Sequence, residues 1–289
     1  MMIKLENVSK VIKDKNILVN VNLELKEGQC YLVKGHNGSG KTMLLRMICG
    51  FLKPTDGKVI YDKEYSYGVI IENPAFFLNE TAMYNMKYLA DINKKIGKEE
   101  IEKWLKKFNL LEFKDKKVKT FSLGMKQRLG IAIALLSKPD FLILDEPING
   151  LDPIGIKEFR LMIQRLNQEK GITILISSHI LSELYLLANR FGILDQGKII
   201  REISKAEFET LSEDYIVLKT VDQDKACQVL KEQIQLQFKV VNPENEIHIF
   251  GNEQDVKQIL KQLTLADVAI DEIYFARQNL EEYFTQLVE

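Results

Sequence analysis

A glycine-rich segment, Gly35 to Thr42, carries the clearest chemical signal in the chain. Its letters, GHNGSGKT, fit the pattern G-x-x-x-x-G-K-[ST] at every fixed position. It lies between an apolar stretch typical of a buried strand, Cys30 to Val33, and one that can continue as a helix, Met43 to Cys49. In that setting backbone N–H groups curl round a phosphate, and the helix N-terminus favours its negative charge. The residues expected to bind the phosphates are Gly35, His36, Asn37, Gly38, Ser39, Gly40, Lys41 and Thr42.

Two side chains of this segment are suited to phosphate chemistry. The Lys41 ammonium can reach the β- and γ-phosphates, which makes it a catalytic candidate, and the Thr42 hydroxyl can ligate Mg²⁺. A glycine-rich loop alone is often only a tight turn. A Lys-Thr pair in register between a strand and a helix instead predicts binding of a nucleoside triphosphate together with Mg²⁺.

A second pair of candidates is Asp145 and Glu146, which follow the apolar run of LILDEP. A carboxylate at the end of a buried strand, Asp145, can hold the Mg²⁺ shell from the side opposite Thr42. Glu146 would then project toward the γ-phosphate and polarise an attacking water, and such general-base assistance is worth about 10²–10⁴-fold. The alternative is a pair of surface acids at a strand end. A phosphate loop about a hundred residues earlier favours the catalytic interpretation.

A third segment, FSLGMKQRLG at Phe121 to Gly130, comes shortly before that strand. Together with the phosphate loop, LILDEP and the INGLDP that follows, it resembles the nucleotide-binding subunit of ABC transporters. The resemblance covers about residues 1–204 and rests on several ordered motifs. It implies an α/β fold of the P-loop NTPase class, with a helical subdomain at about residues 74–138. It also implies a head-to-tail dimer that encloses two ATP molecules.

The resemblance implies roles for further residues. In such a dimer Ser122 and Gly124 would donate hydrogen bonds to the γ-phosphate of the opposite site, from a helix N-terminus. Asp152 would lie in the loop that links the two sites. His179, in ISSHILSE after an apolar strand, would contact the γ-phosphate and hold the site in its reactive form. Taken alone, His179 is typical of an ordinary surface residue.

Several positions depart from the family pattern. Glu72 stands where most members have a glutamine, which is similar to the variant in the bacitracin and lantibiotic resistance branch of drug exporters. A carboxylate there could still bind the metal or its water, with added negative charge near the phosphates. Leu123 and Met125 replace commoner signature residues, and Ile148 replaces a threonine. Ile12 stands where an aromatic residue often stacks on adenine, so the choice between ATP and GTP stays open.

The elements that must position these motifs are short strands and a helical region. Residues from about 80 to 118 have apolar positions at helical spacing, and this stripe, with Trp104, is more typical of core than of a cofactor site. Phe141 to Leu144 and Ile172 to Ile176 are apolar throughout, as in a parallel sheet buried on both faces. Further strands are expected at Ile3 to Val8, Val19 to Leu25, Cys30 to Val33, Lys58 to Tyr61 and Tyr67 to Ile71.

The pattern changes near residue 205. Residues 205–289 carry 8 Lys/Arg against 17 Asp/Glu, whereas residues 1–204 carry 32 against 24. We therefore expect an ATPase domain at 1–204 and an accessory domain at 205–289. The order of short units in the second part predicts a small α+β domain of ferredoxin-like type, with a final helix at Leu280 to Val288. Its lone histidine, His248, lies in an apolar strand and is interpreted as packing rather than as a ligand.

Composition limits the classes of function. The net charge of −1 argues against general nucleic-acid binding, which normally shows a basic excess. Three separated cysteines indicate a reducing compartment. No signal peptide opens the chain, and the longest apolar run, Leu129 to Leu136, is too short to cross a bilayer. We expect a cytoplasmic protein that a membrane partner holds at the inner face of the cell membrane.

The leading hypothesis is the ATPase subunit of an exporter, in which ATP-driven dimer closure moves cargo through a separate transmembrane permease. The aromatic residues of Pro74 to Asn85 would receive a cytoplasmic helix of that permease, and the C-terminal domain would stabilise or regulate the dimer. A homodimer or a pair with a paralogous cassette satisfies the same geometry. The resemblance favours an amphipathic peptide or antibiotic as cargo, which this subunit would not touch. The alternatives are a soluble ABC ATPase acting on ribosomes or DNA, and a module that binds nucleotide without hydrolysing it.

Overall fold

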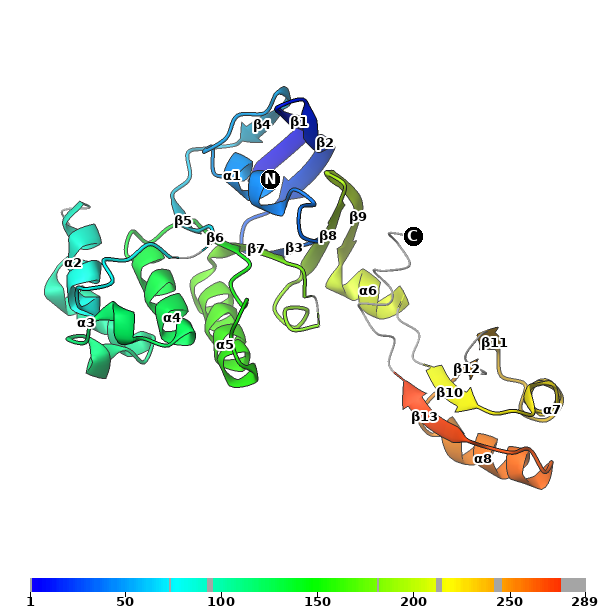
Figure 1. Ribbon diagram of the computed structural model, residues 1–289. Coiled ribbons are helices and arrows are strands. Elements are labelled where there is room, and N and C mark those ends of the chain that lie inside the picture. Colours follow the sequence, from blue (N-terminus) through cyan, green and yellow to red (C-terminus); the bar gives the residue numbers. More distant parts are fainter. Residues whose placement is uncertain are drawn as a thin grey trace. The chain divides into compact units, whose positions relative to one another are not determined.

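The computed structural model describes residues 2–72, 74–92, 96–180, 182–211, 215–241 and 246–276 (Figure 1). The chain divides into two compact units, with the division after Lys205. Each unit has its own hydrophobic core, one with Leu44 and Leu45 and the other with Leu218 and Ile247. Each unit therefore has the packing of a separate domain.

A six-stranded sheet forms the centre of the first unit (Figure 1). Its strands are β3 (Cys30–Lys34), β5 (Tyr67–Ile70), β6 (Phe141–Asp145), β7 (Thr173–Ser178), β8 (Arg190–Asp195) and β9 (Lys198–Ser204). They lie in the order β5-β6-β7-β3-β8-β9; all but β9 are parallel. Every residue of β6 and β7 is buried, which confirms the expected parallel sheet covered on both faces. The carboxyl ends of the parallel strands share one edge, so the loops after β3, β6 and β7 meet there.

A smaller antiparallel sheet packs against the helix that follows the phosphate loop. Its strands are β1 (Ile3–Ile12), β2 (Lys15–Leu25) and β4 (Asp56–Tyr61), and the helix is α1 (Lys41–Ile48). Lys13 and Asp14 join β1 to β2 with φ angles of 47° and 62°, the left-handed pair that a two-residue hairpin turn requires. Buried side chains of these strands and of α1 share one hydrophobic cluster, which holds α1 behind the loop.

A helical subdomain lies between β5 and β6. It contains α2 (Ala82–Ile92), α3 (Lys98–Lys107), two short 3₁₀ turns (Leu111–Phe113 and Val118–Thr120) and α4 (Leu123–Ala134). The helical spacing of residues 80–118 is therefore divided, because Gly97 is extended before α3 and Asn109 has a φ of 55° after it. Trp104 is only 5% exposed, in agreement with its interpretation as core.

One long helix, α5 (Pro153–Lys170), is not among the elements expected from the sequence. Its ends nevertheless carry ordinary signals. Asp152 caps its N-terminus by accepting a hydrogen bond from the Gly155 N–H at 2.9 Å, and Gly171 ends it with a φ of 62°. Its buried residues recur at helical spacing and are Phe159, Ile163 and Leu166.

The second unit contains one antiparallel sheet with helices. Its elements are α6 (Lys205–Leu211), β10 (Tyr215–Lys219), α7 (Gln223–Val229), a π-helical turn (Leu230–Ile234), β11 (Phe238–Val241), β12 (Glu246–Phe250), α8 (Asp255–Leu265) and β13 (Glu272–Ala276). The strand order β11-β12-β10-β13 with antiparallel pairing is that of a ferredoxin-like β-α-β-β-α-β arrangement. The His248 ring stacks on Tyr215 with 4.3 Å between centroids, which is a packing contact. The expected helix Leu280 to Val288 lies outside the described residues.

Two buried cysteines belong to the first unit. Burial raises the pKa of the Cys30 thiol and of the Cys49 thiol to about 12 in each case. Both thiols stay protonated near neutral pH and act as small apolar side chains. In the described part of the chain, no helix has the length and apolar composition needed to cross a bilayer.

Candidate active site

The phosphate loop connects β3 to α1 and turns tightly round its own lysine. Lys41 Nζ donates to the carbonyl oxygens of Gly35 at 2.8 Å and His36 at 3.0 Å. The Ser39 N–H donates to the same His36 oxygen at 3.1 Å. Gly40 has a φ of 107°, and a Cβ there would lie 2.8 Å from a backbone carbonyl oxygen of β2, so glycine is required. The loop thus has the curled backbone that phosphate binding needs.

An open cleft of about 260 Å³ lies at this loop. Two apolar side chains, Ile17 and Met43, line it, and Glu146 lines it as well. Its other lining residues come from the phosphate loop and the start of α1: Asn37, Gly38, Gly40, Lys41 and Thr42. Candidate phosphate-binding groups and apolar side chains therefore line the same cleft.

Asp145 ends β6 beside Thr42 and is 2% exposed. The Thr42 hydroxyl lies 2.6 Å from Asp145 Oδ2, so the structure brings these two metal candidates together. On the other side the Ser177 hydroxyl donates to Asp145 Oδ1, because the pairing of β6 with β7 sets the two residues opposite each other. Ser177 is not among the residues expected from the sequence. Its only signal there is its place at the polar end of an apolar strand.

Glu146 follows in a left-handed conformation, with a φ of 47°. Its N–H donates to the Ser177 carbonyl at 3.2 Å and to the Ser177 hydroxyl at 3.0 Å. Its carboxylate is 18% exposed and lies 3.1 Å from Lys41 Nζ. The two charges neutralise each other at the cleft, and a bound phosphate would compete with Glu146 for the lysine.

His179 lies directly after β7 and contacts the same carboxylate. Its Nδ1 is 2.9 Å from Glu146 Oε2, and its N–H donates to that oxygen at 3.3 Å. The side chain is 36% exposed, so part of the ring is open to a ligand. Lys41, Glu146 and His179 thus form one continuous series of contacts.

Ser122, Gly124 and Asp152 belong to a second group. Ser122 caps α4 by accepting a hydrogen bond from the Met125 N–H at 3.2 Å. A Cβ on Gly124 would lie 3.7 Å from Leu151 Cδ2, so the start of α4 adjoins the loop that contains Asp152. Asp152 in turn accepts a hydrogen bond from the Gly155 N–H at 2.9 Å at the start of α5. Within one chain they form a group distinct from the Lys41 group.

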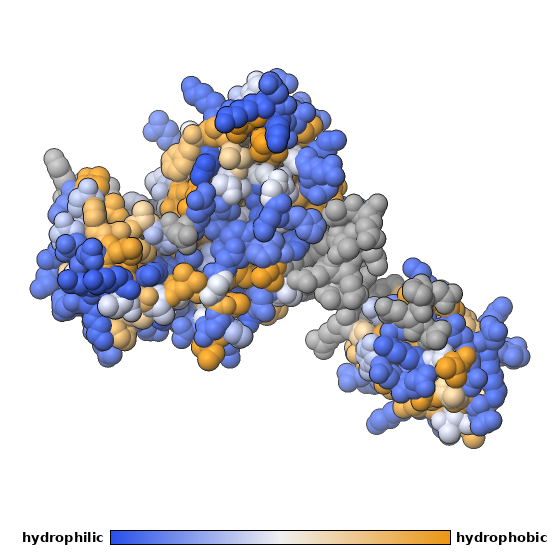
Figure 2. All heavy atoms as spheres, viewed as in Figure 1, coloured by the Kyte–Doolittle hydropathy of each residue, from blue (hydrophilic) through white to orange (hydrophobic). Residues whose placement is uncertain are grey.

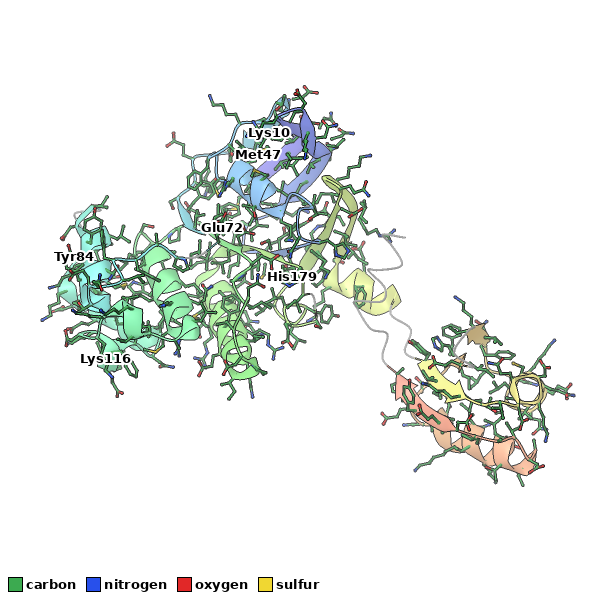
Figure 3. The ribbon with its side chains drawn as sticks, viewed as in Figure 1. Lys10, Met47, Glu72, Tyr84, Lys116 and His179 are labelled. Atoms are coloured by element: carbon green, nitrogen blue, oxygen red, sulfur yellow. The ribbon has the colours of Figure 1, made fainter. Side chains whose placement is uncertain are left out.

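Glu72 stands apart from the other metal candidates. It has a φ of 65°, and its side chain is 71% exposed. Its carboxylate lies 3.4 Å from the Arg46 guanidinium on α1 (Figure 3 labels Glu72). An exposed pair of this kind is worth less than about 1 kcal/mol, so a ligand can draw Glu72 away at little cost. Its role as a metal ligand stays a prediction.

The residues at the cleft fit a nucleotide with its metal ion. Among the described residues, no three or more His, Cys, Asp or Glu side chains gather as in an all-protein metal centre. Mg²⁺ does not require such a centre, because it commonly takes one or two protein ligands and completes its shell with phosphate and water. Thr42 and Asp145 offer two oxygens 2.6 Å apart at this place.

The sequence is similar to one protein family and to two named relatives. Residues 18–149 match the family described as ABC transporter. The bacitracin transport ATP-binding protein BcrA of Enterococcus faecalis is 35% identical, over 99% of this chain and 96% of its own length. The lantibiotic transport ATP-binding protein SrtF of Streptococcus pyogenes is 42% identical, over 73% of this chain and 95% of its own.

A solved structure agrees at the level of the fold. It is the ATP-binding cassette MJ0796, described as a dimeric post-hydrolysis state bound to ADP and Pi. The TM-score is 0.64 at 26% identity, and the match covers 71% of this chain and 99% of that one. The expected P-loop NTPase cassette fold and ATPase activity are therefore confirmed. From its motifs, its fold and these relatives, we conclude that the chain belongs to the ATP-binding proteins of ABC transporters.

Proposed function

We propose that this chain powers an exporter of amphipathic peptides, antibiotics or similar cargo through a separate transmembrane permease. The observation that carries the proposal is the series of contacts from Lys41 through Glu146 to His179, beside Thr42 and Asp145. The cargo class is supported by relatives named for bacitracin and lantibiotic transport. The same names, and a net charge of −1, favour this function over a soluble ATPase that acts on ribosomes or DNA.

In this proposal Glu146 is the general base that accepts a proton from the attacking water. Lys41 is now ion-paired to Glu146 at 3.1 Å and would turn to the phosphates, which releases the carboxylate. His179 Nδ1, 2.9 Å from that carboxylate, would keep it oriented. Thr42 and Asp145 would hold Mg²⁺, which would neutralise phosphate charge when bound. General-base assistance accounts for about 10²–10⁴-fold of the rate.

A second cassette completes the site in this proposal. Within one chain Gly124 adjoins Leu151 and Ser122 accepts from the Met125 N–H, and neither contact involves the Lys41 group. Head-to-tail pairing would bring the N-terminus of α4 of one copy to the phosphate loop of the other, where backbone N–H groups bind anions. The relative MJ0796 is itself described as dimeric. The partner would be a second copy or a paralogous cassette.

An aromatic surface on the helical subdomain is the proposed contact with the permease. It consists of Phe77, Leu78, Tyr84, Tyr88 and Ile92, which are 46% to 65% exposed. Tyr84, Tyr88 and Ile92 recur every four residues and so share one face of α2. The Phe77 ring centroid lies 4.8 Å from that of Tyr88 and 5.9 Å from that of Tyr84. Exposed apolar residues grouped in this way mark a site of contact with another protein.

The aromatic surface lies at one end of the first unit. Figure 2 shows apolar residues among polar ones over the region of α2, and Figure 3 shows Tyr84 there, far along the unit from His179. The buried Asn85 fixes the surface, because it accepts a hydrogen bond from the Phe77 N–H at 2.8 Å and donates to the Phe77 carbonyl at 3.2 Å. The surface is therefore preformed, and a bound helix would press on an ordered element.

A direct contact links this region to α4. A Cβ on Gly130 of α4 would lie 2.6 Å from Pro74 Cγ, so the segment before the aromatic surface packs tightly on that helix. Since Ser122 is the N-cap of α4, movement of the segment can be passed to the end of the helix that we place at the opposite site. This gives dimer closure a mechanical path to the permease.

The test compares cells that express the permease with either the wild-type chain or the Glu146→Gln variant. We expect the wild-type cells to tolerate higher concentrations of bacitracin or a lantibiotic, and the variant cells to lose that tolerance. Equal sensitivity of the two strains to both compounds, with active ATPase in the purified wild-type chain, would contradict the cargo class. The ATPase assignment would stand in that case.

A further inference from the structure

Lys34 is a cation at the end of an internal strand of the main sheet. It is the last residue of β3, whose other four residues are buried, and it is itself half-buried. It pairs with Ser178 of β7 on one side and with Ile193 of β8 on the other. A half-buried charged group at a strand end must recover its lost hydration through hydrogen bonds.

One partner of this lysine belongs to the active site. Lys34 Nζ donates to the backbone carbonyl oxygen of His179. Because Lys34 is paired with Ser178, the residue just before His179, its side chain can reach the turn that follows β7. An ammonium donor forms a charge-assisted hydrogen bond, which is stronger than a neutral one.

His179 is therefore held from two sides. Its N–H donates to Oε2 of Glu146, the residue that follows β6, at 3.3 Å. Its carbonyl oxygen accepts from Lys34, the last residue of β3. Next to it, the Ser178 hydroxyl lies 3.0 Å from both the N–H and the carbonyl oxygen of Ile180. With its backbone fixed in this way, the ring has few orientations available while Nδ1 stays 2.9 Å from Glu146.

We propose that Lys34 is a positioning residue for hydrolysis, which fixes the turn of His179 so that its ring and the Glu146 carboxylate are aligned. This inference rests on the role of His179 in the proposed function. Reacting groups displaced by about 1 Å can cost about 100-fold in rate, so a loosened turn should slow the chemical step. Nucleotide binding should change little, because Lys41 makes its own contacts with the loop carbonyls of Gly35 and His36.

The test measures ATP turnover and nucleotide affinity in full-length Lys34→Met and Lys34→Arg variants. Lys34→Met keeps the length of the side chain without its donors, and we expect kcat to fall about 10- to 100-fold. Affinity for a fluorescent ATP analogue should stay within about twofold, or about 0.4 kcal/mol, because the contacts of Lys41 with the Gly35 and His36 carbonyls remain. Lys34→Arg keeps donors and should recover most of kcat. The matched control is Lys225→Met, which removes a lysine hydrogen bond to the Asp267 carbonyl in the second unit and should leave kcat unchanged.

The link to His179 is tested by combining Lys34→Met with His179→Ala. We expect the double variant to turn over within about twofold of His179→Ala alone, because both changes remove the same alignment. Three results would each overturn the proposal. They are a double variant whose loss of kcat is the product of the two single losses, an unaltered kcat in Lys34→Met, and a loss of affinity in Lys34→Met equal to its loss of kcat. If Lys34→Met fails to fold, Lys34→Gln takes its place, because it keeps a neutral donor. Its kcat is then measured alone and in combination with His179→Ala. A slow His179→Ala beside a normal Lys34→Met would refute only the role of Lys34, whereas a normal His179→Ala would refute the proposed function of His179.

Discussion

At the scale of single residues, Glu146 shows how the end of one strand sets the chemistry. Its left-handed conformation, with a φ of 47°, is uncommon outside glycine and costs on the order of 1 kcal/mol or more. Two hydrogen bonds from its N–H to Ser177 hold that conformation. The turn places the carboxylate between Lys41 and His179 instead of along the strand.

The first prediction concerns Glu146→Gln. The amide keeps the shape of the side chain and one acceptor oxygen but is no longer a base, so we expect phosphate release to fall at least about 100-fold. ATP should still bind and should stabilise the dimer in size-exclusion chromatography. The matched control is Glu158→Gln, an exposed glutamate 3.1 Å from Arg128, which should keep wild-type turnover. Undiminished turnover in Glu146→Gln would remove Glu146 from its assigned role.

The second prediction concerns the hydroxyl of Thr42. Thr42→Val removes the oxygen that lies 2.6 Å from Asp145 and keeps the shape of the side chain, whereas Thr42→Ser keeps the hydroxyl. A lost interaction with a charged group is worth about 1.5–3 kcal/mol, so the Mg²⁺ concentration for half-maximal turnover should rise about 10-fold or more in Thr42→Val. Titration of ATPase rate against Mg²⁺ measures this. The same Mg²⁺ dependence in the valine and serine variants would contradict the metal role.

At the scale of elements, α4 has a cap that serves two purposes in our account. Ser122 accepts the Met125 N–H at 3.2 Å and is also the proposed donor to the opposite γ-phosphate. Loss of such a cap costs about 1 kcal/mol, which lowers the Tm of a domain of this size by about 2–4 °C. The two purposes can be separated because aspartate also caps helices, but its charge repels a phosphate.

The third prediction therefore compares Ser122→Ala with Ser122→Asp. We expect calorimetry to show a lower Tm for the alanine variant and a Tm near the wild type for the aspartate variant. Turnover should be low in both, because neither side chain donates to the phosphate. An aspartate variant with wild-type turnover would show that Ser122 acts only as a cap.

Elements with a repeating or fixed pattern could be predicted from the sequence. The phosphate loop matches a pattern with fixed residue types. The short apolar runs before Asp145 and Ser177 predict buried strands, and both strands are buried throughout. The helical region was harder, because spacing alone does not show that Gly97 and Asn109 divide residues 80–118. The helix α5 was missed although Asp152 and Gly171 mark its two ends.

The partners of each site residue could not be predicted in the same way. The motifs of Asp145 and Thr42 predict that these two residues act together. Ser177 contacts Asp145 because β6 and β7 pair in a particular register. A residue pattern does not give the register between strands distant in sequence. The same holds for Lys34, which is a lone charge in the sequence and reaches His179 only because β3 and β7 are neighbours. Ile148, which stands where the family pattern has a threonine, is 2% exposed and part of the core.

At the scale of the whole molecule, the two units have separate cores. They also differ in charge, since residues 1–204 carry 32 Lys/Arg against 24 Asp/Glu and residues 205–289 carry 8 against 17. A unit with its own core can be removed without opening the core of its neighbour. The proposed role of the second unit is to stabilise or regulate the dimer.

The fourth prediction is that a chain ending at residue 205 still folds and binds ATP but forms a weaker ATP-dependent dimer. We expect sedimentation to show a dimer dissociation constant raised about 10-fold or more, which corresponds to about 1.4 kcal/mol. Nucleotide affinity of the monomer should be unchanged, because the cleft residues lie in the first unit. Unchanged dimerisation, turnover and tolerance in cells would refute this role.

The most direct measurement for the account as a whole is affinity purification of the tagged full-length chain from detergent-solubilised native membranes, with partners identified by mass spectrometry. Its matched control is a chain with Tyr84→Lys and Tyr88→Lys, two side chains that are each 46% exposed, so the fold should tolerate the change. We predict that the wild-type chain recovers a polytopic membrane protein in stoichiometric amount and that the control loses it. Recovery of ribosomal or other soluble partners alone would contradict the transporter assignment and leave only the ATPase.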